Sequence, residues 1–466
     1  MPMNNAISWI PGLEITGQPL YLSIIKSLTS DIEAGRLSHG TRLPTQRDLA
    51  DVLGVALGTV THAYSEAEKR GLIHSEGRRG TFVGDGSGKR TLLSELLETG
   101  TQVIDLSKNH PTYAEDPDLP AALRKLARRP ESQWLLHYPP TAGLPRHREA
   151  GARWLNQLGL ETNGARVILT AGAQHALTVV LATVTDFGDV IATEEYSYPG
   201  IKDIADFLGL QVMGVPMDNH GLVPDGLRAV CRQRRVRALY FNPTLQNPTN
   251  IIFTEERRRA IAQLAEEFDF IMVEDEILRP LVSNPLPFAS SFAPSRSCTI
   301  VSSSKTIAAG LRVAYLSAPT ALVSRLTDTM RTTVLSLPAV TSEILTVWLE
   351  DGTADEIIVR RRAELDRRLK LARNILEEYD MQAPPESSHI WLRLPQRWTT
   401  TQFTIEAHKR GVAVAPAEVF HFGRQSPVNA VRISLGTAPN RETLKKGLEI
   451  IAATLKSSPF REPTAI

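Results

Sequence analysis

The stretch IVSSSKTIAAGLRVAY, residues 300–315, joins a β-branched run to a cluster of hydroxyl and basic side chains. Three serines lead into Lys305, and Arg312 follows seven residues later. The apolar run is typical of a buried strand. A lysine at the end of such a strand can be a structural ion pair, a surface residue or a Schiff-base nucleophile. The stretch alone does not choose among these three roles.

Polar residues also follow other short apolar runs upstream of Lys305. Asp275 ends the run FIMVED, Asn247 lies in the loop NPTLQNPTN, and Gly172 separates a strand-like run from a helical segment. Taken singly, Asp275 could cap a helix and Asn247 could form an Asx-turn. Together they put a carboxylate, an amide, a lysine and helix-start N–H groups at strand ends, where α/β sheets bind ligands. Pyridoxal 5'-phosphate (PLP) carries a phosphate, a pyridine nitrogen, a phenolic oxygen and an aldehyde that fit this set.

The chain from about residue 101 onward alternates short apolar runs with amphipathic helical segments. The predicted strands are Val167–Thr170, Val190–Thr193, Ala238–Asn242, Phe270–Glu274 and Thr299–Ser303. This alternation predicts an α/β domain with a mainly parallel sheet. Near Met381 the pattern changes to the strand-like HIWLRL and NAVRISLG between helices, which indicates a small C-terminal α+β subdomain.

Composition narrows the class of protein. The 466 residues suggest two or three domains, and 52 basic against 51 acidic residues give no overall field for nucleic acid or membrane. Two cysteines, Cys231 and Cys298, do not form a disulfide framework and fit a reducing compartment. The start of the sequence lacks the pattern of a signal peptide, and no apolar run is long enough to span a bilayer. We therefore expect a cytoplasmic protein without a membrane partner, and we predict no metal site.

The first eighty residues carry a helical pattern of their own. PLYLSIIKSLTSDIEAG predicts an amphipathic helix, and Thr45 can cap a second helix through its hydroxyl. Gly54 predicts a tight turn into a third helix that ends near Gly71, and LIHSEGRRGTFV predicts two short strands around a basic tip. This pattern is a helix-turn-helix with a wing, although three helices and a hairpin can also be just a small fold.

Residues 19–84 resemble the GntR family of winged-helix repressors. The resemblance rests on GRLSHGTRLPTQRDLADVLGV, GTVTHAY, KRGLI and GRRGTFV. It implies that Arg47 contacts the DNA backbone, that Thr59 opens the recognition helix, and that a wing contacts DNA. The DNA-binding residues implied are Arg47, Thr59, Thr61, Arg78, Arg79 and Gly80. The chain departs from the family at Ala56-Leu57, where Ser or Thr followed by Arg is usual, and this puts the usual operator contacts in doubt.

Residues 103–458 resemble the fold type I aminotransferases, with many motifs in the same order. The resemblance implies that Lys305 forms the internal aldimine with PLP. It also implies that Asp275 pairs with the pyridine nitrogen, Asn247 bonds the ring oxygen, and Tyr198 stacks on the ring. The remaining residues implied are Ala173, Gln174, Ser302 and Arg312 at the phosphate, Tyr138 at the partner subunit's phosphate, and Arg432 at a substrate or effector carboxylate. Read without the resemblance, Arg432 could be a surface arginine on a strand.

Three positions depart from the aminotransferase pattern. Leu278 stands where a tyrosine usually bonds the ring oxygen, and Asn250 and Ala417 stand where glycine is usual. The leucine removes one hydrogen bond to the cofactor, worth about 1 kcal/mol. We therefore expect the cofactor to bind and efficient transamination to be lost.

The chain as a whole resembles the MocR subfamily, in which a GntR-like winged helix precedes an aminotransferase-like domain. We expect a winged helix over 1–84, a linker over 85–102, and a PLP domain over 103–458, with its large part at 103–380 and its small part at 381–458. The resemblance implies a head-to-tail homodimer that binds operator DNA and senses an amine, an amino acid or PLP itself through the aldimine at Lys305. Transaminase activity is expected to be weak or absent. Two alternatives remain open: an aminotransferase with a vestigial winged helix, and a regulator that no longer binds PLP.

Overall fold

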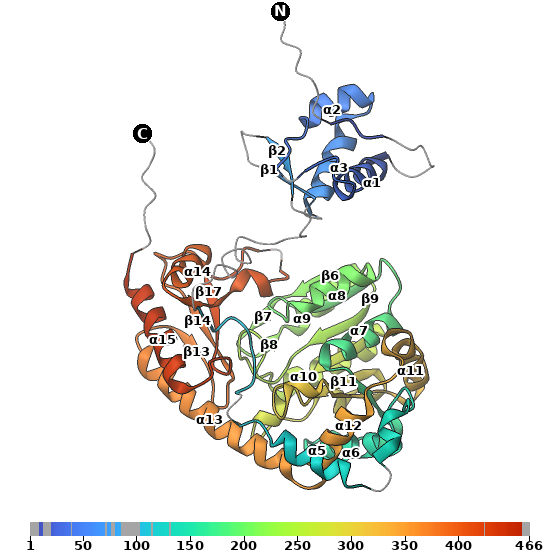
Figure 1. Cartoon of the computed structure of the whole chain (residues 1–466), viewed down its shortest axis with the longest axis vertical. Helices are drawn as coiled ribbons and strands as arrows, with labels where there is room; N and C mark the ends of the chain where they lie inside the picture. The colour runs from blue at the N-terminus through green and yellow to red at the C-terminus, as the bar shows by residue number, and fades with distance from the viewer. Residues whose placement is uncertain are drawn as a thin grey trace, which may run out of the picture. The chain divides into compact units, whose positions relative to one another are not determined.

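The computed structural model describes residues 9–12, 20–38, 40–69, 72–75, 80–84, 103–112, 115–129, 132–423 and 425–458 (Figure 1). Its contacts divide the chain into two compact units, Met1–Gly100 and Thr101–Ile466. The predicted linker at 85–102 lies outside the described residues, as do Arg78 and Arg79 of the predicted wing tip. The finer domain boundaries therefore stay predictions.

The described residues of the first unit form three helices and a two-stranded antiparallel sheet. The elements are α1 Leu20–Glu33, α2 Gln46–Leu53, α3 Leu57–Lys69, β1 Ile73–Ser75 and β2 Thr81–Val83. The hydroxyl of Thr45 accepts a hydrogen bond from the Asp48 amide at 3.2 Å, which caps α2. Gly54 ends α2 with φ +64°, a conformation that favours glycine. Helix α3 begins at Leu57, two residues before the predicted Thr59, because the turn after α2 is already closed at Val55, whose amide donates to Ala50.

The second unit is built on a seven-stranded sheet in the order β4-β12-β11-β10-β9-β5-β6. The strands are β4 Val167–Thr170, β5 Val190–Glu194, β6 Gln211–Val215, β9 Val236–Phe241, β10 Ile271–Asp275, β11 Ser297–Ser302 and β12 Ala314–Ser317. Within this sheet β12 runs antiparallel to both of its neighbours, and the other neighbouring pairs are parallel. The prediction of a mainly parallel α/β sheet is confirmed.

Helices cover both faces of this sheet. Along β9, Ala238 and Tyr240 pack into one core, and Leu239 and Phe241 pack into another, because successive side chains of a strand point to opposite faces. The helices are α5 Leu119–Ala127, α6 Pro145–Gln157, α7 Ala173–Val184, α8 Gly200–Leu208, α9 Pro224–Gln233, α10 Glu255–Phe268, α11 Thr320–Val334 and α12 Ala339–Glu350. A hairpin of β7 Met217–Asp218 and β8 Gly221–Leu222 lies between β6 and α9 in the chain.

A four-stranded sheet with its own core forms the smaller C-terminal part, in the order β13-β14-β17-β16. Its elements are α13 Thr353–Ile375, β13 Met381–Gln382, β14 His389–Arg393, α14 Thr400–Lys409, β15 Val412–Ala413, β16 Ala415–Pro416, β17 Ala430–Ser434 and α15 Arg441–Lys456. The short strand β3, Ile104–Asp105, pairs in parallel with β15, and Leu106 packs into the core of this smaller part. The first described segment of the second unit therefore packs with the smaller C-terminal part. The predicted boundary at about residue 381 assigned this segment to the large part instead.

Candidate functional site

Lys305 lies just after β11, at the end of the sheet where the parallel strands finish. Its Nζ donates a hydrogen bond to the backbone carbonyl of Asn109. Burial lowers the pKa of Lys305 to about 8, and the positive charges of Arg432 and Arg312 act in the same direction, while Asp275 opposes them. A larger fraction of this amine is therefore neutral near pH 7 than for an ordinary lysine, as a nucleophile requires.

Asp275 is the last residue of the neighbouring strand β10 and is buried. The hydroxyl of Tyr240 donates to its Oδ2 at 2.7 Å, and the Ile277 amide donates to its Oδ1 at 3.3 Å. Burial raises the pKa of Asp275 to about 6, although these two hydrogen bonds oppose the shift. A cation placed beside this carboxylate would hold it ionised. The sequence reasoning missed Tyr240, whose signal was its place on β9, two residues before the loop that begins at Asn242.

Asn242 directly follows β9 and bonds to the last residues of the two neighbouring strands, β5 and β10. The sequence analysis did not single it out. Its amide donates to Glu194 Oε1 at 2.7 Å, and its side-chain nitrogen donates to the backbone carbonyl of Asp275. Its side-chain oxygen accepts a hydrogen bond from the Asn247 amide at 3.1 Å. These bonds hold the loop of Asn247 against the strand end that carries Asp275. Glu194 is fully buried, and burial raises its pKa to about 7.

A cradle for an anion lies at the start of α7. Gly172 precedes the helix with φ +87°, and no side chain caps the helix start, so the first-turn amides of Ala173 and Gln174 have no capping partner. A Cβ at Gly172 would lie 2.5 Å from Nη2 of Arg312, which shows how closely the guanidinium approaches the loop. Arg312 also donates to Ser304 Oγ at 3.3 Å. A helix start, an arginine and a hydroxyl together suit a phosphate.

Ser302 and Tyr198 each bond to a residue of this cradle. Ser302 is buried, and its hydroxyl donates to Ser304 Oγ at 3.1 Å. Ser304, which the sequence reasoning did not single out, is the serine that contacts Arg312. The Tyr198 hydroxyl donates to Gln174 Oε1 at 3.4 Å, and burial raises the pKa of this tyrosine.

Arg432 is on β17 and is buried, with only 6% of its surface exposed. Its Nη1 donates to Asn247 Oδ1 at 2.7 Å, its Nη2 donates to the backbone carbonyl of Ser107, and its guanidinium lies 4.7 Å from the ring centre of Phe420. Its Nε is buried and finds no hydrogen-bond acceptor among the described residues. Burial lowers the pKa of Arg432 to about 10, so the group is a cation at neutral pH. A buried cation with an unpartnered N–H is suited to an anionic ligand.

The structure shows what surrounds the three residues that depart from the aminotransferase pattern. Asn250 has φ +62°, where glycine is usual, and its side-chain nitrogen donates to the backbone carbonyl of His389 at 2.8 Å, which ties this loop to β14. Leu278 is buried beside Lys305 in a small hollow that Leu281 and Leu365 also line. Ala417 is fully buried at the start of the turn after β16.

Tyr138 stands apart from this site in the single chain. It is 85% exposed, and the neighbouring Leu136 is 79% exposed. The contact of Tyr138 with a partner subunit's phosphate therefore stays a prediction.

The residues around Lys305 fit PLP. The uncapped helix start at Gly172 suits the phosphate of PLP, and the carboxylate of Asp275 suits its pyridine nitrogen. The unpartnered N–H of Arg432 suits the carboxylate of a ligand. No group of histidine, cysteine and acidic residues suited to a metal ion occurs in the described part of the chain.

In the first unit, four of the residues expected to contact DNA lie in the described part of the chain: Arg47, Thr59, Thr61 and Gly80. Arg47 is exposed at the start of α2, and the Thr61 hydroxyl donates to Gln46 Oε1 at 2.9 Å, which links α3 to α2. Thr59 is half-buried in the first turn of α3. A Cβ at Gly80 would lie 2.9 Å from Nε of Arg42, so glycine is needed where the wing returns to β2. Among the described helices, none has the length and apolar character that a bilayer span needs.

Comparison with known proteins gives matches for both units. The family model of aminotransferase class I and II matches residues 101–451, and that of the bacterial regulatory proteins of the gntR family matches residues 20–83. The HTH-type transcriptional regulator YdeF of Bacillus subtilis is 28% identical over 460 residues, which cover 98% of this chain and 99% of YdeF. The HTH-type pyridoxine biosynthesis transcriptional regulator PdxR of Corynebacterium glutamicum is 31% identical over 363 residues, covering 74% of this chain and 76% of PdxR.

The solved structures support the same fold for the second unit. LysN, the α-aminoadipate aminotransferase of Thermus thermophilus complexed with N-(5'-phosphopyridoxyl)-L-leucine, aligns with a TM-score of 0.71 at 24% identity, over 79% of this chain and 95% of LysN. The chain therefore belongs to the aminotransferase class I and II family, and its N-terminal GntR domain gives it the MocR-type architecture of a DNA-binding domain fused to a PLP-dependent aminotransferase-like domain.

Proposed function

We propose that this protein is a transcriptional regulator that binds operator DNA through its first unit and senses an amine, an amino acid or PLP itself at Lys305. The observation that carries the proposal is that one chain joins a helix-turn-helix unit to a site where Lys305, Asp275 and Arg432 converge. The relatives YdeF and PdxR, which cover most of this chain, are named as transcriptional regulators.

Each residue of the site has a role in this proposal. Bound PLP supplies an aldehyde that reacts with primary amines. Lys305 would hold that aldehyde, Asp275 would keep a proton on the ring nitrogen, and Asn247 would donate to the ring oxygen. The residues that complete the site are Tyr198 on the ring, Ala173, Gln174, Ser302 and Arg312 at the phosphate, the partner subunit's Tyr138, and Arg432 at the ligand's carboxylate.

We further propose that the protein works in the cytoplasm as a head-to-tail homodimer. Exposed Tyr138 and Leu136 support an interface on this side of the second unit, since large apolar side chains in such exposed positions commonly mark protein contacts. Analytical ultracentrifugation of wild type and a Leu136→Glu variant tests this part, and a monomeric wild type would contradict it.

The decisive test measures the visible absorption spectrum of the purified protein beside Lys305→Ala and Lys446→Ala variants. Wild type and Lys446→Ala should be yellow, because Lys446 is an exposed lysine of α15 that is not among the residues of the site, and Lys305→Ala should lack the band while remaining folded. An unchanged band in Lys305→Ala would mean that another lysine holds the cofactor. A protein that stays colourless with added PLP would favour a regulator that senses a ligand in the emptied pocket.

DNA binding needs its own assay. The full-length protein should bind DNA from its own promoter region, and an Arg47→Ala variant should bind more weakly on all sequences with a smaller dependence on salt, as expected for a phosphate contact. Binding that does not survive competitor DNA would remove the regulatory function.

The alternative function is an aminotransferase, and the convergence of Lys305, Asp275 and Arg432 is the observation that favours it. Leu278, which lies beside Lys305 where the family has a tyrosine, argues against it. Transfer of amino groups from a panel of amino acids to 2-oxo acids at ordinary enzymatic turnover would establish the enzyme.

A further inference from the structure

The segment of residues 103–112, here called the strap, is the first described part of the chain after the predicted linker. It is held against the smaller part of the second unit by backbone hydrogen bonds. The amides of Ile104 and Leu106 donate to the carbonyls of Gly411 and Ala413, both at 2.9 Å, and the Ser434 amide donates to the carbonyl of Leu106 at 2.8 Å. The strap therefore links the end of the linker to β17, the strand that carries Arg432.

Two carbonyls of the strap bind two of the basic groups of the cofactor site, Arg432 and Lys305. The carbonyl of Ser107 accepts a hydrogen bond from Nη2 of Arg432, and the carbonyl of Asn109 accepts one from Nζ of Lys305. Asp105 fixes this part of the strap, because its Oδ1 accepts from the Ser107 amide at 2.8 Å and from the Ser107 hydroxyl at 2.6 Å. The strap thus touches both groups that a ligand with an amine and a carboxylate would engage.

The geometry of Arg432 puts its contact with Ser107 in competition with a carboxylate ligand. The Nε–H and an N–H of Nη2 point to the same side of a guanidinium and form the fork that grips a carboxylate with two bonds. In this chain Nη2 is bound to Ser107 and Nε has no acceptor among the described residues. A carboxylate that takes both arms of this fork competes with the carbonyl of Ser107 for Nη2, while Nη1 keeps its bond to Asn247.

We propose that the strap is the element through which ligand occupancy of the cofactor site reaches the linker and the DNA-binding unit. A ligand carboxylate on Arg432 competes with the Ser107 contact, and PLP held on Lys305 would replace the Asn109 contact, so ligand and cofactor act on different bonds of the strap. This inference rests on the proposed function and names its route of regulation. It requires no contact between the two units other than the chain itself.

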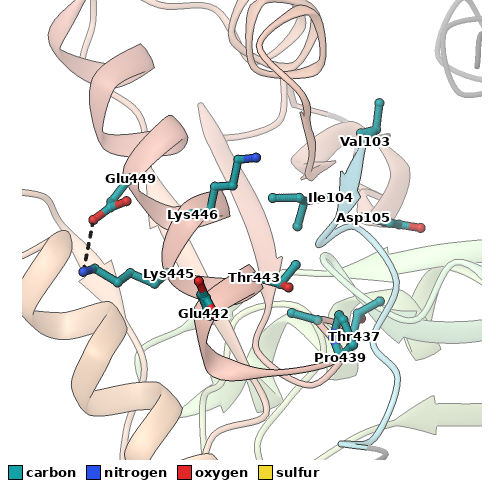
Figure 2. Close-up of a pocket in the computed structure, with 11 residues that line it drawn as sticks. Val103, Ile104, Asp105, Thr437, Pro439, Glu442, Thr443, Lys445, Lys446 and Glu449 are labelled. Carbon is teal, nitrogen blue, oxygen red and sulfur yellow. Dashed lines mark ion pairs between the residues drawn. The ribbon is translucent and has the colours of Figure 1, made fainter. Parts of the chain in front are cut away.

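The strap borders a hollow at the protein surface, so it can move when one of its contacts is lost. Beside β3 and the first half of α15 is a surface hollow, and Figure 2 shows Val103, Ile104 and Asp105 on one side of it and side chains of α15 on the other. Lys445 of α15 pairs with Glu449 of the same helix at 3.7 Å rather than with the strap. The Thr437 hydroxyl donates to the carbonyl of Lys108 in the middle of the strap. Further side chains hold its C-terminal half, since Ser388 donates to Asn109 Oδ1 at 3.3 Å and Arg361 donates to the carbonyl of Thr112. Each of these bonds contributes to the local stability of the strap, so the loss of one should change its hydrogen exchange by a measurable factor.

The test uses hydrogen exchange of strap amides in the full-length, PLP-loaded protein, together with the Kd for promoter DNA. Arg432→Gln removes the guanidinium that holds Ser107, and Arg393→Gln is its matched control, an exposed arginine of the neighbouring strand β14. We expect Arg432→Gln to speed exchange of the strap about tenfold, since a hydrogen bond from a charged donor is lost. We also expect it to change the DNA Kd at least threefold, and Arg393→Gln to change neither.

A second variant guards against a folding defect in Arg432→Gln. Thr437→Val loosens the strap at Lys108 without touching the cofactor site, and it should speed strap exchange and shift the DNA Kd in the same direction, by about fivefold or less. Unchanged strap exchange, or unchanged DNA affinity, in both variants overturns the inference while leaving the proposed function intact. A wild-type protein that shows no visible PLP band or no specific DNA binding overturns the proposed function, and the inference with it.

Discussion

The lowered pKa of Lys305 gives a prediction whose size follows from the structure. With a pKa of about 8, roughly one Lys305 amine in ten is neutral at pH 7, whereas an amine with the ordinary value of 10.5 is neutral in roughly one molecule in 3,000. The neutral fraction is therefore about 300-fold larger than for an ordinary lysine. The shift has two physical sources that can be varied separately, burial and the facing charges of Arg432, Arg312 and Asp275.

Competitive acetylation of the cofactor-free protein, with peptide mass spectrometry from pH 6 to 11, measures this pKa directly. The midpoint of the pH dependence reports the pKa whatever the access of the reagent. Wild type should titrate near pH 8, Arg432→Gln at a higher pH because a facing cation is gone, and Asp275→Asn at a lower pH because a facing anion is gone. A wild-type midpoint at or above pH 10, or shifts of the opposite sign in the two variants, would refute this reasoning.

The same shift has a consequence for stability. Because the unfolded chain binds more protons at Lys305 than the folded chain between about pH 8 and 10.5, the contribution of this group to stability should rise with pH across that window. Urea unfolding of the cofactor-free protein and of Lys305→Met at pH 7.5 and pH 10 checks the sign. The stability advantage of Lys305→Met over wild type should shrink at the higher pH.

The remaining predictions concern residues around the site. Tyr240→Phe removes the 2.7 Å hydrogen bond to Asp275, which should raise the pKa of Asp275 and weaken PLP binding by about tenfold, measured by equilibrium dialysis. Gly172→Ala should weaken PLP binding more than tenfold, because its Cβ would lie 2.5 Å from a guanidinium nitrogen. Gly188→Ala is the matched control, with φ +86° and nothing within 4 Å, so equal losses in both variants would point to backbone strain alone. Arg258→Met leaves buried Glu274 without its cation and leaves Glu276 with Arg279 alone, and it should lower the free energy of unfolding by about 3–5 kcal/mol in urea titration. A loss below about 1 kcal/mol would contradict this prediction.

Much of the fold could be predicted because its signals are local. The strand that ends at Asp275 and the strand just before Lys305 are short apolar runs that end in polar residues, and their observed bounds differ from the predicted ones by one or two residues. The cap at Thr45 and the turn at Gly54 follow from the chemistry of single residues. The antiparallel direction of β12 and the early start of α3 were not predicted, since neither has a local sequence signal.

The parts of the site that escaped prediction are contacts between residues far apart in the sequence. Tyr240 binds Asp275 from a neighbouring strand, and Ser107 reaches Arg432 across 325 positions of the chain. Ser107 acts through its backbone carbonyl, which any residue would supply, so no side-chain pattern marks it. Asn242 was passed over because an asparagine before proline is a common turn residue, and its bonds to the ends of two neighbouring strands appear only once the strands are placed side by side.

The pairing of β3 with β15 has a consequence for how the protein is made. Ile104 lies opposite Val412, so the edge that receives β3 leaves the ribosome about 300 residues after β3 itself. The first unit, whose contacts are local, can complete its folding early in synthesis, whereas the second unit has to wait for nearly the whole chain. A nascent or truncated product that ends before β15 would carry the helix-turn-helix but no docked strap and no Arg432. Such a product would bind DNA without being able to respond to a ligand, so translation must run almost to its end before control by ligand exists.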